Sequence, residues 1–176
     1  MHKNLILYYS RAGMNYVNGK IVNLSKGNTE ICAEYIQNAV GGDLFAIRTK
    51  KPYSADYTEC TRQAQAELSA GARPKLEAYL EDISGYDHIF VLGPCWWGTY
   101  PMAVFSLLEG LDFTGKKVIP LMTHEGSGMG NGERDLRRLC TGAVFGTSMA
   151  VHGADAEKSQ KAIAAWATKN MENETV

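Results

Sequence analysis

A chain of 176 residues with 45% hydrophobic and 21% charged residues has the composition of an ordinary folded protein, which excludes disordered and fibrous classes. Lysine and arginine number 18 against 19 aspartate and glutamate, so the formal net charge of -1 gives no whole-molecule attraction to nucleic acid or to an anionic membrane. The length predicts a single domain over residues 1–176.

The cysteines and the N-terminus indicate where such a protein resides. Four cysteines are scattered along the chain without a Cys-x-x-Cys pair, so we expect neither a metal site nor a disulfide framework. The N-terminus lacks the long apolar core of a signal peptide, and no segment approaches the roughly 20 apolar residues that a membrane helix needs. We therefore expect a reduced, cytoplasmic protein without a membrane span.

Short runs rich in β-branched and aromatic residues recur along the chain, and segments with helical periodicity lie between them. Because the runs are apolar at nearly every position, they predict the strands of a parallel sheet that is covered on both faces. The expected fold class is therefore α/β, a three-layer sandwich with a five-stranded parallel sheet. The predicted strands span residues 4–9, 43–49, 88–93, 117–123 and 143–151.

The first helix is expected over residues 28–40, ending at the glycine pair Gly41-Gly42. Its predicted inner face holds Ile31, Tyr35, Ile36, Ala39 and Val40, at spacings of three and four.

Two further helical segments are indicated between the second and third strands, and another at the end of the chain. Residues 56–70 and 74–83 both show helical patterns, and we interpret the first as an exposed helix within an added helical region over residues 50–72. The last helix is predicted over residues 156–171, with Ile163 and Trp166 facing inward.

Ligands of an open parallel sheet bind beyond the carboxyl ends of its strands, so the residues that follow the strands are the candidate site. Ser10 follows the first strand and, after an insertion at residues 11–26, Gly27-Asn28-Thr29 begins the first helix. Hydroxyl, amide and backbone N–H donors at a helix N-terminus suit a phosphate group. Alternatively, Asn28 simply caps the helix; the two interpretations are compatible. Loop closure costs grow slowly with length, so Ser10 and the Gly27 segment can form one site.

The loops after the third and fourth strands supply aromatic and glycine residues to the same edge. The adjacent Trp96 and Trp97 cannot both enter one side of a core, so one of them is free to cover a flat ligand, unless both fill gaps between helix and sheet. The glycines after His124 allow a ligand to approach the backbone closely, although a bare flexible turn would look the same. His124 either carries positive charge beside a ligand or bonds the neighbouring backbone, and Glu125 is expected to face solvent.

These three loops, each following a strand, resemble the flavodoxin-like FMN-binding proteins, in particular short bacterial members with Pro-x-Trp-Trp-Gly and Thr-His-x-Gly-Ser-Gly loops. The resemblance extends from Leu5 to about Trp166. It implies a sheet of order 2-1-3-4-5 with non-covalently bound FMN at its carboxyl edge. The cofactor-binding residues that it implies are Ser10, Gly27, Asn28 and Thr29 for the phosphate, and Pro94, Trp96, Trp97, Gly98, Thr123, His124, Gly126, Ser127 and Gly128 around the ring.

Two functions follow from the resemblance. One is an NAD(P)H-dependent oxidoreductase that passes electrons to a quinone or another small-molecule acceptor; the other is a flavodoxin-type carrier that docks to redox proteins. Carriers of this family are usually strongly acidic, so the net charge of -1 favours the enzyme. A binding module without flavin is a third alternative. The insertion at residues 11–26 departs from the family pattern, and could be a lid, a partner surface or a homodimer contact; no catalytic residue is identified.

Overall fold

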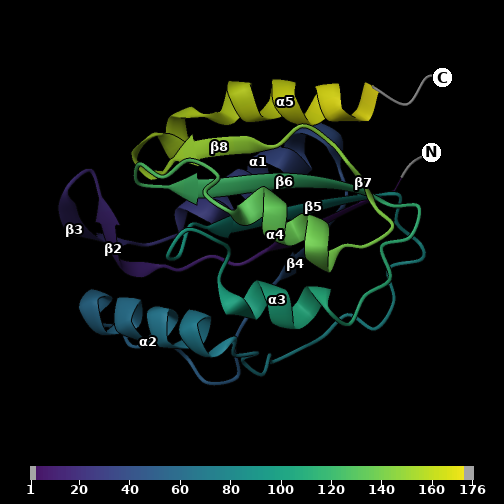
Figure 1. Cartoon of the computed structure of the whole chain (residues 1–176). Helices are drawn as coiled ribbons and strands as arrows, with labels where there is room; N and C mark the ends of the chain where they lie inside the picture. The colour runs from purple at the N-terminus through teal and green to yellow at the C-terminus, as the bar shows by residue number, and fades with distance from the viewer. Residues whose placement is uncertain (1–2, 173–176) are drawn as a thin grey trace.

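A parallel sheet runs through the centre of the molecule, which a computed structural model describes over residues 3–172 (Figure 1). The strand order is β4-β1-β5-β6-β7, and β8 also pairs with β6. With β4 as the second predicted strand, this is the order 2-1-3-4-5 implied by the resemblance, and the flavodoxin-like α/β fold is confirmed. The strands are β1 (Asn4–Tyr8), β4 (Asp43–Ala46), β5 (His88–Pro94), β6 (Lys117–His124), β7 (Val144–Phe145) and β8 (Met149–His152).

Alternation along the buried strands creates two separate cores. In β1, Leu5 and Leu7 belong to the core on one face of the sheet, while Ile6 and Tyr8 belong to the core on the other. Helices α3 (Met102–Leu108) and α4 (Gly132–Leu139) cover the first face, and α1 (Asn28–Val40) and α5 (Gln160–Glu172) cover the second (Figure 1). Within residues 3–172, no helix combines the length and the apolar character needed to cross a membrane.

Helix α1 has the predicted bounds and ends at Gly41, whose φ of 72° only glycine adopts easily, but its buried face is rotated from the predicted one. The buried positions are Thr29, Cys32, Ala33 and Ile36, whereas Ala39 is exposed. Of the predicted face, Ile36 is buried and Tyr35 and Val40 pack partly buried against the core, so the prediction is confirmed in part. The buried positions that it missed are Thr29 and the small residues Cys32 and Ala33.

The fifth predicted strand is broken into β7 and β8. Along β6 the paired positions advance by four residues, from Lys117 to Leu121, while their partners advance by five, from Val144 to Met149. The extra residue forms a bulge, as expected where a strand bends away from its neighbour. At this break Asn170 of α5 replaces a strand: its Oδ1 accepts from the N–H of Thr147 at 2.9 Å, and its Nδ2 donates to the Thr147 carbonyl at 3.3 Å.

The region between β4 and β5 contains one of the two predicted helices. Helix α2 (Tyr57–Ala70) is capped by Asp56, which accepts from the N–H of Glu59, and it buries only Cys60 and Ala64, as expected of an exposed helix.

The helix predicted over residues 74–83 does not form. Leu76 pairs instead with Thr49 in an antiparallel bridge, flanked by hydrogen bonds from Lys50 to Lys75 and from Glu77 to Arg48. Leu76 and Ile83 reach the core from this extended path, so tertiary pairing overrides the helical spacing.

The insertion at residues 11–26 folds as an antiparallel hairpin of β2 (Gly13–Val17) and β3 (Lys20–Leu24). Its turn is Asn18-Gly19, with φ angles of 54° and 82°, which is the pattern of a tight two-residue hairpin turn. In Figure 1 the hairpin lies beyond the ends towards which β6 and β8 point. This hairpin was not predicted, although an Asn-Gly pair between alternating segments is a strong hairpin signal.

The two ends of the insertion meet at Gly27. A methyl group at Gly27 would lie 2.1 Å from the Ser10 Oγ and 2.8 Å from the Arg11 carbonyl oxygen. The chain entering the hairpin therefore packs directly on the chain leaving it, and the interrupted loop is continuous in space.

We expect Gly27→Ala to lower the free energy of unfolding by about 1–3 kcal/mol, because the added methyl must displace the Ser10 segment. The φ of Gly27 is -66°, so the effect is steric rather than conformational. Gly85→Ala is the matched control, since a methyl there meets no atom within 4 Å. Urea unfolding of both variants measures the difference; equal stability of the two would contradict the close packing of the loop.

Candidate functional site

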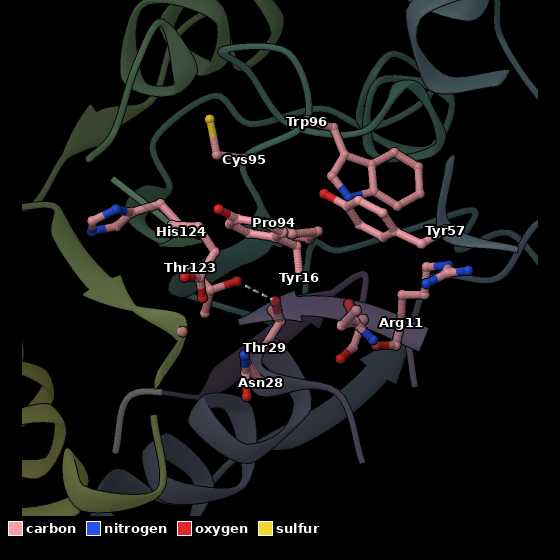
Figure 2. A pocket seen from close by; sticks show the side chains of 14 residues that line it. Arg11, Tyr16, Asn28, Thr29, Tyr57, Pro94, Cys95, Trp96, Thr123 and His124 are labelled. Atoms are coloured by element: carbon pink, nitrogen blue, oxygen red, sulfur yellow. Dashed lines mark hydrogen bonds between the residues drawn. The ribbon is translucent and has the colours of Figure 1, made fainter. Parts of the chain in front are cut away.

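A cleft opens at the carboxyl ends of β1, β5 and β6, where the predicted loops converge (Figure 2). The hairpin and the start of α2 complete its walls. Its lining residues are Ser10, Arg11, Asn15, Tyr16, Asn28, Thr29, Tyr57, Pro94, Cys95, Trp96, Thr123, His124, Glu125 and Gly153.

Seven of the thirteen predicted cofactor-binding residues line this cleft: Ser10, Asn28, Thr29, Pro94, Trp96, Thr123 and His124. The other six lie on the same loops without lining it: Gly27, Trp97, Gly98, Gly126, Ser127 and Gly128. That these thirteen residues contact a cofactor remains a prediction.

The N-terminus of α1 forms one end of the cleft. Ser10 Oγ accepts a hydrogen bond from the N–H of Glu30 at 3.1 Å, so a residue outside the helix supplies the hydroxyl that would normally come from its cap. The cap position itself is Gly27, and Asn28 makes no cap bond, so the interpretation of Asn28 as the cap is wrong. The Asn28 side chain instead lines the cleft.

Two threonines join α1 to the end of β6 on the cleft wall. Thr29 Oγ1 and Thr123 Oγ1 lie 2.8 Å apart and both side chains are buried (Figure 2). Each hydroxyl can donate once and accept twice, so their mutual bond leaves hydrogen-bonding capacity for a ligand.

The two adjacent tryptophans have different surroundings, as predicted. Trp96 lies partly buried, with its ring centre 5.1 Å from those of Tyr9 and Tyr53 in edge-on packing. Trp97 is 51% exposed and adopts a φ of 55°, a backbone conformation rare for a bulky residue. Its Nε1 donates to the Thr61 carbonyl of α2 at 2.8 Å, which fastens this strained turn to the helix.

The glycine-rich loop after β6 packs against the tryptophan turn. A methyl group at Gly130 would lie 2.5 Å from the Gly98 carbonyl oxygen, which also accepts from the N–H of Asn131 at 2.7 Å. The glycines therefore allow two loops to touch, which fixes the rim of the cleft.

His124 bonds the backbone rather than carrying a charge. Its Nδ1 accepts from the N–H of Gly126 at 2.9 Å, so this nitrogen holds no proton. Burial lowers the pKa of His124, and the nearby His152, with ring centres 5.7 Å apart, lowers it further. The imidazole is therefore neutral at pH 7 in this structure.

Glu125 does not face solvent, contrary to the prediction. Its side chain is only 22% exposed, its Oε2 accepts from the N–H of Asn18 at 3.0 Å, and the same oxygen lies 3.3 Å from His152 Nε2. Glu125 thus connects the loop after β6 to the tip of the hairpin.

The aromatic pair Tyr16 and Tyr57 was not predicted as part of the site. Their rings stack with centres 6.2 Å apart and planes inclined by 23°, which holds the hairpin against the start of α2. With the Asn18–Glu125 bond, this contact attaches the hairpin at both sides of the cleft. Tyr57 directly follows the Asp56 cap, so recognising the helix start and the hairpin together would have placed both rings at the cleft edge.

Arg11 adds a positive charge to the cleft. Its guanidinium donates to the carbonyls of Met14, Ser54 and Ala55, and within residues 3–172 the ion pairs of arginine with carboxylates involve other arginines. Carbonyl bonds fix its position without neutralising it, so its charge remains available to an anion.

A second cavity continues the cleft towards α2. The first has a volume of about 140 Å³ and the second of about 320 Å³, and they share Arg11, Asn15, Tyr57, Cys95 and Trp96. Their combined volume falls in the size range of small-molecule and cofactor sites, roughly 300–1,000 Å³. Within residues 3–172, no group of three or more His, Cys, Asp or Glu side chains could hold a metal ion.

An α/β sheet of this order, with a cleft at its carboxyl edge, defines a flavodoxin-like protein. A family model described as flavodoxin matches residues 3–170, nearly the whole chain. The chain therefore belongs to the flavodoxin family. No curated protein sequence matches it significantly.

Solved structures from several bacteria are similar over almost their full length. Two proteins named "putative flavoprotein", from Bacteroides uniformis ATCC 8492 and Bacteroides eggerthii DSM 20697, are each 27% identical, with TM-scores of 0.74 and 0.75. The alignments cover 95% and 96% of this chain and 98% of each of theirs. A flavoprotein from Lactobacillus acidophilus NCFM, solved in complex with FMN, shares the fold at 19% identity and a TM-score of 0.62, over 90% of this chain and 98% of its own.

We expect Thr29→Val to lower the free energy of unfolding by about 1–3 kcal/mol, because it leaves the buried Thr123 hydroxyl without its partner. The double variant Thr29→Val/Thr123→Val removes both hydroxyls and should cost less than the sum of the single variants. Urea unfolding of the four proteins gives the coupling energy, and strict additivity would show that the hydroxyls do not interact.

His124 should titrate below the usual histidine value of about 6.5 when followed by NMR in the chain without ligand. Its folded-state pKa is lowered, so the unfolded chain binds the proton more readily and stability falls as the pH drops from about 6.5 towards the folded-state pKa. In the variant His152→Asn the titration midpoint of His124 should rise without reaching the usual histidine value, because burial lowers the pKa of His124 more than His152 does. A midpoint above the usual value in the unaltered chain would refute the assignment.

Proposed function

We propose that the chain binds FMN non-covalently in the cleft at the carboxyl edge of the sheet. The donors at one end suit a phosphate: the N-terminus of the 13-residue α1, the hydroxyls of Ser10 and Thr29, and the amide of Asn28. The aromatic side chains at the other end, Tyr57 and Trp96, suit a flat ring. The donor set therefore fits the cofactor, and the FMN complex of the Lactobacillus acidophilus relative supports the proposal.

The reaction that we propose is the two-electron reduction of a quinone or similar small molecule at the expense of NAD(P)H. FMN supplies the redox chemistry when bound, and the protein determines what reaches it. The observation that favours a small-molecule acceptor is the hairpin, which is fastened to α2 through Tyr16 and Tyr57 and to the β6 loop through Asn18 and Glu125. A cleft bordered by an attached hairpin can admit a small molecule more readily than it can contact the surface of a protein partner. The four free cysteines, three of them buried, suit the reducing environment of the cytoplasm.

A flavodoxin-type electron carrier is the second candidate. The observation in its favour is Trp97, which is half-exposed at the rim and held rigidly by its bond to Thr61. An exposed, fixed aromatic side chain is typical of protein interfaces.

The purified protein should be yellow, or should become so with added FMN. Rapid oxidation of NADH or NADPH in the presence of a benzoquinone, dependent on bound FMN, supports the enzyme. If nicotinamide oxidation is no faster than with free FMN, while a chemical reductant still bleaches the protein, the carrier is favoured. A colourless protein that binds no added FMN would refute both functions.

A further inference from the structure

One buried oxygen of the cleft lining, Glu125 Oε1, has no hydrogen-bond partner among residues 3–172. Glu125 Oε2 accepts a hydrogen bond from the Asn18 N–H and lies 3.3 Å from His152 Nε2. Oε1, in contrast, is buried and accepts no hydrogen bond from any of residues 3–172. Burying a carboxylate oxygen without a donor is costly, so folding alone does not explain its position.

The unpaired oxygen lies beside the proposed phosphate end. A methyl group at Gly153 would be 2.4 Å from Glu125 Oε1 and 2.7 Å from Asn28 Nδ2, so both atoms flank the same glycine backbone. Asn28, Glu125 and Gly153 all line the cleft. The carboxylate therefore lies next to the Asn28 amide, one of the donors at the proposed phosphate end of the cleft.

A carboxylate can only accept, so its ligand partner must carry a donor. A phosphate offers oxygens of the same charge, which a carboxylate repels. The aromatic side chains that suit the flat ring, Tyr57 and Trp96, lie away from Asn28 and Thr29 in the cleft (Figure 2). The polyol chain that joins phosphate and ring in FMN carries hydroxyl donors and would lie between these two ends of the cleft.

We propose that Glu125 binds the ribityl chain of the flavin through Oε1 while it holds the hairpin through Oε2. This inference rests on the proposed FMN binding and extends it. One carboxylate then joins the cofactor to the tip of the hairpin, so occupation of the cleft and closure of the hairpin stabilise each other. Glu125 is a positioning residue for the hairpin as well as a ligand-binding one.

The test compares three flavins on the full-length chain freed of flavin: FMN, riboflavin, which lacks the phosphate, and lumiflavin, which lacks the polyol chain. In Glu125→Gln the affinity for FMN and for riboflavin should fall about tenfold, because the charged acceptor is lost, while lumiflavin binding should change by less than about twofold. Asp155→Asn is the matched control: it removes a charge 3.6 Å from the other ring nitrogen of His152, outside the cleft lining, and should leave all three affinities unchanged.

Hydrogen exchange of the Asn18 amide gives a readout independent of affinity. Riboflavin at saturation should slow this exchange in the unaltered chain, lumiflavin should not, and Glu125→Gln should abolish the difference.

If Glu125→Gln lowers the affinity for all three flavins equally, Glu125 acts through the fold and the proposal is overturned. Tighter FMN binding by Glu125→Gln, with riboflavin unchanged, would show repulsion of the phosphate and would also overturn it. If the unaltered chain binds none of the flavins, the proposed function itself fails, which is a distinguishable result.

Discussion

The close contact between Ser10 and Gly27 is the constraint on which the site depends. Ser10 Oγ accepts from the N–H of Glu30 and thereby fixes the end of β1 to the beginning of α1. Only a glycine at position 27 leaves room for that approach. The two ends of the inserted hairpin are therefore held together at Ser10 and Gly27. The donors at the N-terminus of α1 keep their geometry although the hairpin interrupts the loop.

The cleft combines a polar end with an aromatic end, and the hairpin spans both. Stacking of Tyr16 on Tyr57 fastens it near the aromatic end, while the bond from Asn18 to Glu125 fastens it near the polar end. Few other contacts hold the hairpin, which has only two strands and buries little apolar surface. A hairpin attached at a few points can open without disturbing the sheet.

The sheet and the location of the cleft could be predicted from the sequence because both depend on local patterns that the fold reinforces. Apolar runs and glycine stops predicted the strands and α1, and the carboxyl edge followed from the parallel order. The helix expected at residues 74–83 failed because its apolar spacing also suits an extended segment, and the pairing of Leu76 with Thr49 decided between them. The role of Glu125 could not be predicted, since its partner Asn18 lies 107 residues away.

The break in the fifth strand has a consequence for synthesis of the chain. Asn170 supplies both a donor and an acceptor to Thr147, so a side chain near the C-terminal end of α5 completes the hydrogen bonding at the sheet edge. During synthesis the hydrogen bonding of this edge cannot be completed until residue 170 has emerged, because Asn170 supplies the acceptor for the Thr147 N–H. A chain shortened before residue 170 would therefore leave the Thr147 N–H unpaired at the sheet edge, while the Thr147 carbonyl would keep its 2.7 Å bond from Trp166 Nε1.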